Sequence, residues 1–123
     1  MKFESNIKNY TPHEITLIGD DGKPLISFPS CGVARCQVTR ERTGNISVFV
    51  SNEGVKKLHL IPINSTNFGQ VEGLPEPNGE NLFIVSLAVA QAMSEKRSDL
   101  LVTDDTVRDE NGKIVGCRAF ARV

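Results

Sequence analysis

The first two-thirds of the chain alternate between short β-prone hydrophobic runs and turn-forming residues, a pattern that predicts strands joined by tight turns. Ile15–Ile18 and residues 25–28 flank Asp21 and Gly22, which predicts a β-hairpin because both turn residues tolerate positive φ. Residues 34–39 alternate apolar with polar side chains, so we expect a strand with one solvent-facing side.

The middle of the chain is predicted to contain two further strands and a long loop. Thr-Gly-Asn at residues 43–45 predicts a turn that leads into a strand at residues 46–50. Residues 58–63 predict another strand, which Pro62 is expected to break because proline lacks the amide hydrogen of a sheet ladder. Residues 64–80 hold three glycines and two prolines, so we expect a long ordered loop, or an irregular crossing, of the kind that often carries function.

The last third contains the one segment for which the sequence predicts a helix. Residues 82–85 form a short apolar run typical of a strand, and Ser86 follows at a position suited to a helix N-cap. The residues after Ser86 are apolar on nearly all sides of a helix, which predicts that the helix is buried. Residues 100–102 then predict a strand, so this part of the chain is expected to form a strand-helix-strand unit.

Asn111 and Gly112 predict a second hairpin, which joins residues 106–108 to residues 114–123. With the strands before it, this pattern predicts the α+β class: a mostly antiparallel β-sheet with one buried helix near residues 86–95. The chain has 123 residues, of which 39% are hydrophobic and 24% charged. We therefore expect a single β-rich domain over residues 1–123, because two separate cores would be hard to build from this length.

The formal net charge of −1 gives no electrostatic reason to expect nucleic acid or a membrane surface as a partner. The charge is unevenly distributed, however. Residues 33–59 carry five basic and two acidic side chains, whereas residues 70–110 carry nine acidic and three basic ones. Either the two segments complement each other across the self-association surface of a homo-oligomer, or they are ordinary solvated faces.

Cysteine usage and the N-terminal sequence predict a cytoplasmic location. The odd count of three cysteines (Cys31, Cys36 and Cys117) without a CxxC pair argues against a disulfide framework and against a zinc site. The sequence begins Met1-Lys2-Phe3-Glu4, without an apolar run, so we expect neither a signal peptide nor a membrane span. No metal and no cofactor is predicted.

The junction between residues 82–85 and the helix is the strongest candidate for a binding site. Backbone amides at a helix N-terminus beside the hydroxyl of Ser86 can bind an anion. Arg97, Arg108 and Arg118 lie in the same third of the sequence, and arginine binds phosphate in two-point geometry. The alternative is that Ser86 only caps its helix and that the arginines pair with nearby aspartates such as Asp99.

Motifs for catalysis are weak in this sequence. His13, Ser86 and Asp99 are the residue types of a hydrolytic triad, but Ser86 lacks a GxSxG context, and no P-loop, GxGxxG or HExxH is present. His13 either contacts a ligand or anchors a loop. The aspartates of one acidic cluster either hold a hard cation or form turns: Asp104, Asp105 and Asp109. The sequence therefore favours a binding protein over an enzyme.

Several phrases together resemble a family of short bacterial, prophage and phage proteins. They are Thr-Pro-His-Glu-Ile at residues 11–15, Phe-Gly-Gln-Val-Glu-Gly-Leu-Pro-Glu-Pro at 68–77, Ile-Val-Ser at 84–86, Arg-Ser-Asp-Leu-Leu-Val at 97–102, and the segment 107–118. Relatives tend to have proline at the position of Thr103, and residues 55–67 also depart from the family's pattern.

The resemblance implies a phage-related context rather than a defined activity. Small phage proteins without enzymatic motifs often act by binding, and some sequester nucleotide immune signals. The leading hypothesis is therefore a sponge for a cyclic or ADP-ribose-type nucleotide. Its expected ligand-binding residues are Ser86, Arg97, Arg108, Arg118, His13, Gly73 and Glu76. Two alternatives remain: a protein that inhibits a host protein through the loop at residues 64–80, and a small nucleotide hydrolase that uses His13, Ser86 and Asp99.

Overall fold

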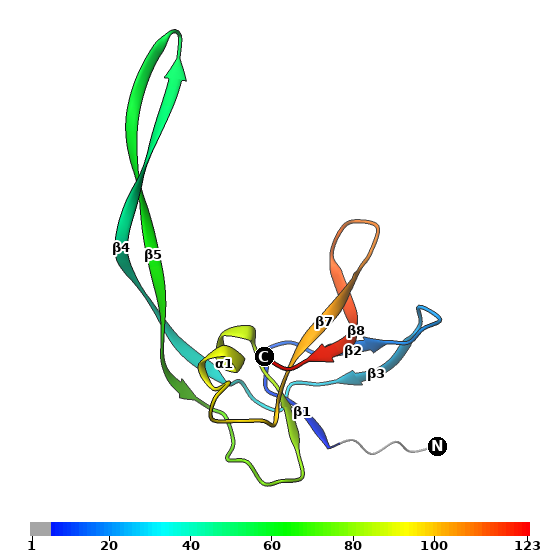
Figure 1. Ribbon diagram of the computed structural model, residues 1–123. Helices are drawn as coiled ribbons and strands as arrows, with labels where there is room; N and C mark the ends of the chain where they lie inside the picture. Colours follow the sequence, from blue (N-terminus) through cyan, green and yellow to red (C-terminus); the bar gives the residue numbers. More distant parts are fainter. Residues whose placement is uncertain (1–5) are drawn as a thin grey trace. The chain divides into compact units, whose positions relative to one another are not determined.

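The computed structural model describes residues 6–123 and confirms the predicted α+β class, since it is mostly β-strand with one short helix in the described part. Figure 1 labels the elements in chain order. They are β1 (Ile7–Asn9), β2 (Ile15–Ile18), β3 (Pro24–Phe28), β4 (Arg35–Asn52), β5 (Val55–Glu72), β6 (Leu82–Ile84), α1 (Leu87–Ala92), β7 (Leu100–Arg108) and β8 (Ile114–Ala121).

Six strands form one sheet in the order β1-β6-β7-β8-β2-β3. The predicted hairpins are both present as the antiparallel pairs β2–β3 and β7–β8. Parallel pairs join β1 to β6, β6 to β7 and β2 to β8, so the sheet combines both kinds of ladder. The strand β1 was not expected from the sequence, because three residues are too few to give a periodic pattern.

The strand β6 lies at the centre of the hydrophobic core and is covered on both faces. Phe83 and Val85 pack in one buried cluster, which includes Val89 and Ala90 of α1. Ile84 packs in the other cluster because successive side chains of a strand point to opposite faces. An uninterrupted apolar run such as residues 82–85 is typical of a strand buried on both sides.

The helix α1 lies where the sequence predicts it, with one side buried in the core. Val89 and Ala90 are buried against the core, whereas Leu87 remains 55% exposed at the first turn. The helix therefore stays in place through one buried side, although its sequence is apolar nearly all round. Met93 follows as the C-cap, with a backbone N–H that donates to Val89 O at 3.1 Å.

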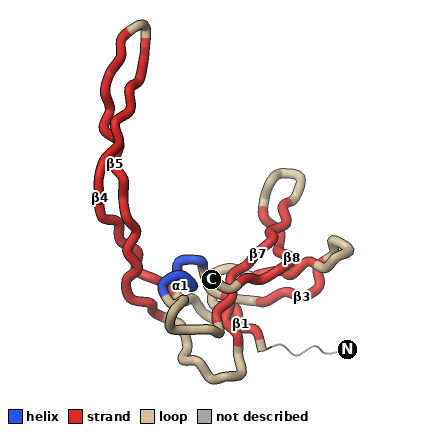
Figure 2. The backbone as a smooth tube through the Cα atoms, viewed as in Figure 1, coloured by secondary structure: helices blue, strands red, loops and turns tan. Residues whose placement is uncertain are grey.

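The strands β4 and β5 form a separate two-stranded sheet, and the chain divides into two compact units. We call residues 6–36 and 70–123 the body, and Gln37–Gly69 the arm. The predicted turn at residues 43–45 is wrong, because β4 runs straight through this segment. The hairpin turns instead at Glu53 and Gly54, whose φ angles of 50° and 79° are those of a two-residue hairpin turn. Figure 2 shows the arm as an extended strand pair that a short turn closes at its tip.

Two further expectations about this segment are wrong. Pro62 does not break the strand, since β5 continues through it to Glu72. A two-stranded ribbon has two open edges, and proline is tolerated where its missing amide hydrogen faces an open edge. The expected loop at residues 64–80 is correspondingly shorter, because its first part is strand and only residues 73–81 are irregular.

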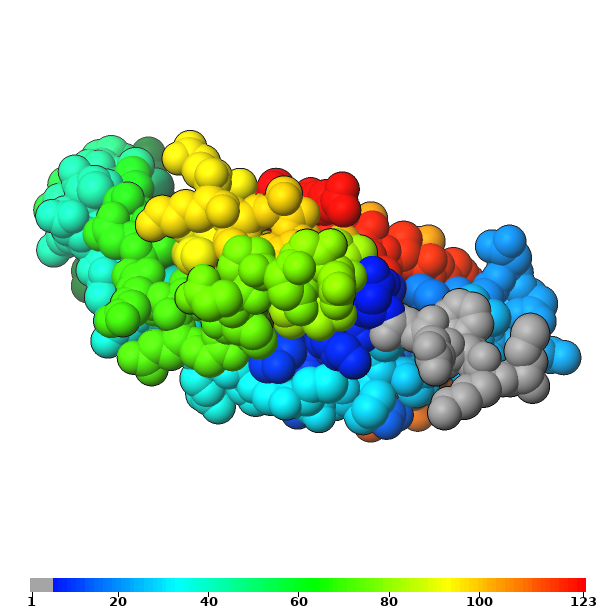
Figure 3. Space-filling view, turned by 90° about the horizontal axis from the view of Figure 1, so that it is seen from below, coloured from blue at the N-terminus to red at the C-terminus, as the bar shows by residue number. Residues whose placement is uncertain are grey.

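The remaining loop at residues 73–81 is tied to other segments of the body at several points. Asn6 donates its side-chain amide to Glu80 O at 2.6 Å, and Figure 3 shows this loop beside the start of β1 on the surface. Gly73 has a φ of 81°, and a Cβ at this position would lie 2.3 Å from Val33 O. Only glycine fits this close approach. Across residues 6–123, no helix is long and apolar enough to cross a membrane.

Candidate functional site

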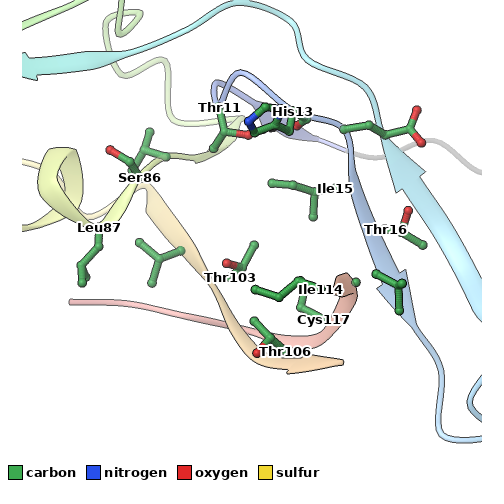
Figure 4. Close-up of a pocket in the computed structure, with 15 residues that line it drawn as sticks. Thr11, His13, Ile15, Thr16, Ser86, Leu87, Thr103, Thr106, Ile114 and Cys117 are labelled. Atoms are coloured by element: carbon green, nitrogen blue, oxygen red, sulfur yellow. Dashed lines mark hydrogen bonds between the residues drawn. The ribbon is translucent and has the colours of Figure 1, made fainter. Parts of the chain in front are cut away.

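The candidate site is a partly open pocket of about 390 Å³ in the body. Residues of β2, β7 and β8 line it, together with the turn before β2 and the junction between β6 and α1. In Figure 4, Thr11 and His13 lie together at one end, and Ser86 and Leu87 lie at the side where α1 begins. The apolar lining residues are Ile15, Val85, Leu87, Val102, Ile114, Val115, Gly116 and Cys117, and the polar ones are Thr11, His13, Glu14, Thr16, Ser86, Thr103 and Thr106.

A buried asparagine holds the turn that carries Thr11 and His13. Asn9 is 1% exposed, and its side-chain amide donates to His13 O at 2.7 Å and to Phe28 O at 2.9 Å. Its carbonyl oxygen accepts from Thr11 N at 2.9 Å and from the Thr11 hydroxyl at 2.7 Å. All three hydrogen-bonding groups of this amide are therefore used, which fixes the backbone of residues 9–13 at one end of the pocket.

Further hydrogen bonds and a ring contact hold the same turn. The hydroxyl of Ser30 donates to Thr11 O at 2.7 Å, and Tyr10 N donates to Ile84 O at 2.8 Å. The ring of Tyr10 packs edge-on against Phe83 with centroids 5.5 Å apart. The turn thus joins the core directly, so the rim of the pocket at Thr11 and His13 is pre-formed.

Ser86 caps the helix, as the alternative interpretation of the sequence predicts. Its backbone is extended, with φ −66° and ψ 158°, and its hydroxyl oxygen accepts from Val89 N at 3.4 Å. This hydrogen bond occupies the hydroxyl oxygen on the helix side. Ser86 still lines the pocket beside Leu87, so it contributes polar surface at the rim.

The floor of the pocket depends on a close approach between β2 and β8. Leu17 pairs with Cys117 in the parallel ladder, and a Cβ at Gly116 would lie 2.6 Å from Thr16 O. Only glycine lets the two backbones come this near. Cys117 is buried, and burial raises the pKa of its thiol because the thiolate loses hydration. The thiol is therefore neutral near pH 7, and the floor is uncharged.

Arg97 lies outside the lining of this pocket and makes structural contacts. It donates through Nε and Nη2 to the two carboxylate oxygens of Asp99 at 2.9 and 2.8 Å. Its Nη2 also donates to Pro75 O at 2.9 Å, and its guanidinium lies 5.9 Å from the centre of the Phe83 ring. The hydrogen bond to Asp99 raises the pKa of Arg97 and lowers that of Asp99. Arg97 thereby fastens the loop at residues 73–81 to the core.

The other predicted ligand-binding residues are also placed away from the pocket lining. Arg108 donates to Gly112 O at 2.7 Å within the β7–β8 turn, and Arg118 is an exposed residue of β8. Glu76 is exposed in the loop that Arg97 holds, and Gly73 serves the close approach to Val33. Of the seven residues, the pocket brings together His13 and Ser86.

The aspartates considered for a hydrolytic triad and for a cation site have other hydrogen-bond partners. Both carboxylate oxygens of Asp99 accept from Arg97, so this carboxylate is committed to an ion pair. Asp109 accepts from Asn111 N at 2.9 Å and Lys113 N at 3.0 Å, which shapes the β7–β8 turn. Among residues 6–123, no group of three or more His, Cys, Asp or Glu side chains is arranged to hold a metal ion.

Sequence reasoning missed most of the pocket lining. Thr103 and Thr106 of β7 and Ile114 of β8 are surface residues without a motif, and they reach the pocket because the hairpin pairs β7 with β8 beside β2. No pattern in the sequence marked the two threonines as neighbours, because residues three apart in a regular strand point to opposite faces. The strand departs from regular geometry between them, at Asp105, whose φ is 50°. Comparison of the chain with protein-family models, with curated proteins and with solved structures found no match.

Proposed function

We propose that this protein is a non-catalytic binding protein that holds the nucleoside part of a nucleotide-derived ligand in the pocket between β2, β7, β8 and the start of α1. The observation that carries the proposal is the composition of this 390 Å³ pocket, with an uncharged apolar floor and a rim of hydroxyls. Its volume lies in the range of about 300–1,000 Å³ that is usual for small-ligand sites.

The polar groups at the rim suit hydrogen bonding to a base and a ribose. Thr103 and Thr106 offer hydroxyls that both donate and accept, whereas the carboxylate of Glu14 accepts. An exocyclic amino group or ribose hydroxyls supply the matching donors. The apolar side chains of Ile15 and Ile114 offer surface against which a flat ring can pack.

The charge of the lining decides which part of a nucleotide fits. Among the described residues that line the pocket there is no lysine or arginine, and Glu14 is acidic. A phosphate therefore gains little by lying inside, so we propose that phosphates of a cyclic or ADP-ribose-type ligand extend out of the open side. This refines the sponge hypothesis, in which arginines were expected to hold the phosphates.

Three features favour binding over turnover. Asp99 is paired with Arg97, the hydroxyl oxygen of Ser86 accepts from Val89 N, and the pKa of the Cys117 thiol is raised by burial. A nucleophile needs an adjacent base or a lowered pKa. These contacts give neither to Ser86 nor to Cys117, so we propose that a bound ligand is released unchanged.

The phage-related context and the cytoplasmic location are parts of the same proposal. Cys31 is an exposed free thiol and Cys117 a buried one, which suits a reducing compartment. The alternative of a host-protein inhibitor that acts through the loop after β5 has less support. That loop is held down by Asn6 and Arg97 rather than presented to a partner.

Native mass spectrometry of the protein, expressed in bacteria and mixed with adenosine, cyclic AMP or ADP-ribose, tests the proposal. We expect a complex with one ligand per chain, and recovery of the same compound after denaturation. Adenosine alone should also bind, because the nucleoside is the part that the pocket holds. Recovery of hydrolysis products would make the protein an enzyme. Binding that requires phosphates and ignores adenosine would contradict the assigned orientation.

A further inference from the structure

The arm (Gln37–Gly69) carries most of the exposed apolar surface of residues 6–123. Of the sixteen large hydrophobic side chains that are exposed there, eleven belong to this one hairpin. Their exposed fractions run from 38% to 70%, so none is sheltered within the chain. They are Val38, Ile46, Val48, Phe49, Val50, Val55, Leu58, Leu60, Ile61, Ile63 and Phe68. Exposed apolar side chains gathered in this way mark an interaction site.

The half of the arm nearest its turn, residues 46–63, carries apolar side chains on both faces of the strand pair. Successive residues of a strand point to opposite faces, so Leu58 and Leu60 lie on one face of β5 and Ile61 lies on the other. Near-continuous apolar runs such as residues 58–63 are typical of strands that are buried on both sides. An isolated two-stranded hairpin is marginally stable in water, so the arm needs an outside surface to pack against.

The charge of the arm identifies that surface. The arm carries four basic and two acidic side chains, a net charge of +2, and the rest of the chain carries ten basic and thirteen acidic side chains, a net charge of −3. Opposite net charges steer two surfaces together, whereas like charges oppose association. The body of a second copy of this chain is therefore a complementary partner for the arm, and a second arm is not.

The dimensions of the arm are sufficient for a stable contact. A strand rises about 3.3 Å per residue, so the arm is roughly 50 Å long, and two strands span about 10 Å in width. Each face therefore offers roughly 500 Å², and both together roughly 1,000 Å². If the arms of two copies each pack with one face on the other's body, each copy buries one arm face and an equal patch of body, roughly 1,000 Å² per partner, whereas a standard stable interface buries about 800 Å².

We propose that the arm of one copy packs against the body of a second copy, so that the protein self-associates through reciprocal arm-to-body contacts. This goes beyond the binding function of the pocket. The arm supplies apolar anchors and a positive charge, and the body of the partner copy supplies the negative surface. A reciprocal contact of this kind is closed by a two-fold axis and buries both arms at once.

Sedimentation velocity of the full chain over a range of concentrations tests the apolar part of the proposal. We expect a dimer or a larger closed assembly. Replacing Phe49, Leu58 and Leu60 together by threonine keeps the β propensity of the arm and removes its anchors, so association should weaken roughly 100-fold or more. Ser47→Thr with Ser51→Thr, at exposed polar positions of the same hairpin, is the matched control and should leave association unchanged. A monomeric wild-type chain, or equal weakening in both variants, would overturn the proposal.

A charge reversal separates arm-to-body contact from arm-to-arm contact. Lys56→Glu with Lys57→Glu changes the net charge of the arm from +2 to −2. The repulsion between two arms is unchanged, because both carry a net charge of the same size as before. The arm and the body of a partner, which attract each other in the wild type, both carry negative net charge in the variant and repel each other. Arm-to-body contact predicts at least roughly tenfold weaker association. Unchanged association would show that the arms pair with each other and would overturn the assignment.

Zero-length carbodiimide cross-linking of mixed ¹⁵N-labelled and unlabelled chains gives a readout that does not depend on any variant. The proposal predicts amide cross-links between Lys56 or Lys57 of one isotopic form and carboxylates of residues 70–123 in the other. Cross-links that join arm lysines to carboxylates of the same isotopic form alone would overturn it.

Discussion

The side-chain amide of Asn9 donates to His13 O at 2.7 Å across a turn of four residues, and this bond places one end of the pocket. The same amide also reaches Phe28 O, so the strand β3 and the turn before β2 are fixed by one buried side chain. The rim of the pocket is thus anchored in the core rather than in a surface loop. Pre-formed rims of this kind reduce the entropy cost of binding a small ligand.

Asn9→Ala should destabilise the fold and loosen the pocket together. The change removes the hydrogen bonds of Asn9, a side chain that is 1% exposed, to Thr11 N, His13 O and Phe28 O, and of these three atoms His13 O also accepts from the Thr11 hydroxyl. We expect a loss of about 2–4 kcal/mol in the free energy of unfolding, measured by urea denaturation. Ser27→Ala, which removes an exposed hydroxyl contact with Thr16, is the control and should cost well under 1 kcal/mol. Equal losses in the two variants would contradict the role assigned to Asn9.

Gly116→Ala should be destabilising because the new methyl group would lie 2.6 Å from Thr16 O. Overpacking between two backbones costs about 1–3 kcal/mol, so a fall in melting temperature of several degrees is expected. Gly19→Ala is the matched control. There the nearest atom is an oxygen of the flexible Asp21 side chain at 3.3 Å, and the melting temperature should change little. If Gly116→Ala were as stable as wild type, β2 and β8 would not approach as described.

The Arg97–Asp99 pair should contribute stability that depends on pH in a defined direction. The hydrogen bond from Arg97 lowers the pKa of Asp99 in the folded state below its ordinary value of 3.8. The contribution is therefore fully present above pH 3.8 and is lost as the pH falls through the lowered pKa. The side chains are 8% and 17% exposed, so Asp99→Asn should cost about 1–3 kcal/mol at pH 7.

Urea denaturation of wild type and Asp99→Asn at pH 7, pH 5 and below pH 3 measures this difference directly. The difference in the free energy of unfolding should be constant between pH 7 and pH 5 and should shrink below pH 3.8. A difference that grows on acidification would reverse the sign and refute the assigned ion pair.

Cys117 should react with iodoacetamide far more slowly than Cys31 at neutral pH. Cys31 is exposed, whereas Cys117 is buried at the pocket floor, and burial raises the pKa of its thiol. A lower thiolate fraction and poor access both slow alkylation, so a ratio of initial rates of roughly 100 or more is expected. Mass spectrometry of tryptic peptides follows both sites in one sample. Comparable rates would mean that the floor of the pocket is open to solvent.

Local pattern was sufficient to predict the two hairpins and the helix of the body. The hairpins around Gly22 and Gly112 were predicted because each glycine takes a positive φ between two β-prone runs, at 79° and 81°. The position of α1 followed from Ser86, whose side chain caps the helix as its residue type predicts. The hairpin turns and the helix start depend on residues close together in the chain, so they can be predicted from the sequence alone.

The arm and the pocket were not predicted, for two different physical reasons. Glycine and proline often end a strand, but Gly44 and Pro62 lie within β4 and β5, because an exposed ribbon tolerates both residue types. The turn forms instead at Glu53 and Gly54. The pocket depends on the parallel pairing of β2 with β8, which are about a hundred residues apart in the chain. Pattern within a short window does not reveal such a contact.

The partner of a charged side chain is likewise not decided by local sequence, as Arg97 shows. Arg97 was expected to bind a ligand. In the structure it forms an ion pair with Asp99, two positions further along the chain. The sequence offered both interpretations, and three-dimensional placement decides between them. The lining residues Thr103 and Thr106 carried no motif at all, although they supply the hydroxyls on which the proposed function depends.

Calorimetric titration of adenosine and ADP-ribose into wild type, Thr103→Phe and Thr66→Phe tests the central claim most directly. Thr103 lines the pocket, whereas Thr66 is an exposed threonine of β5 that does not line it. We expect wild type and Thr66→Phe to bind with the same affinity, and we expect Thr103→Phe, which fills the pocket, to bind at least roughly 100-fold more weakly. Equal binding by all three proteins, or no binding of either compound to wild type, would contradict the assignment of this pocket as a nucleoside site.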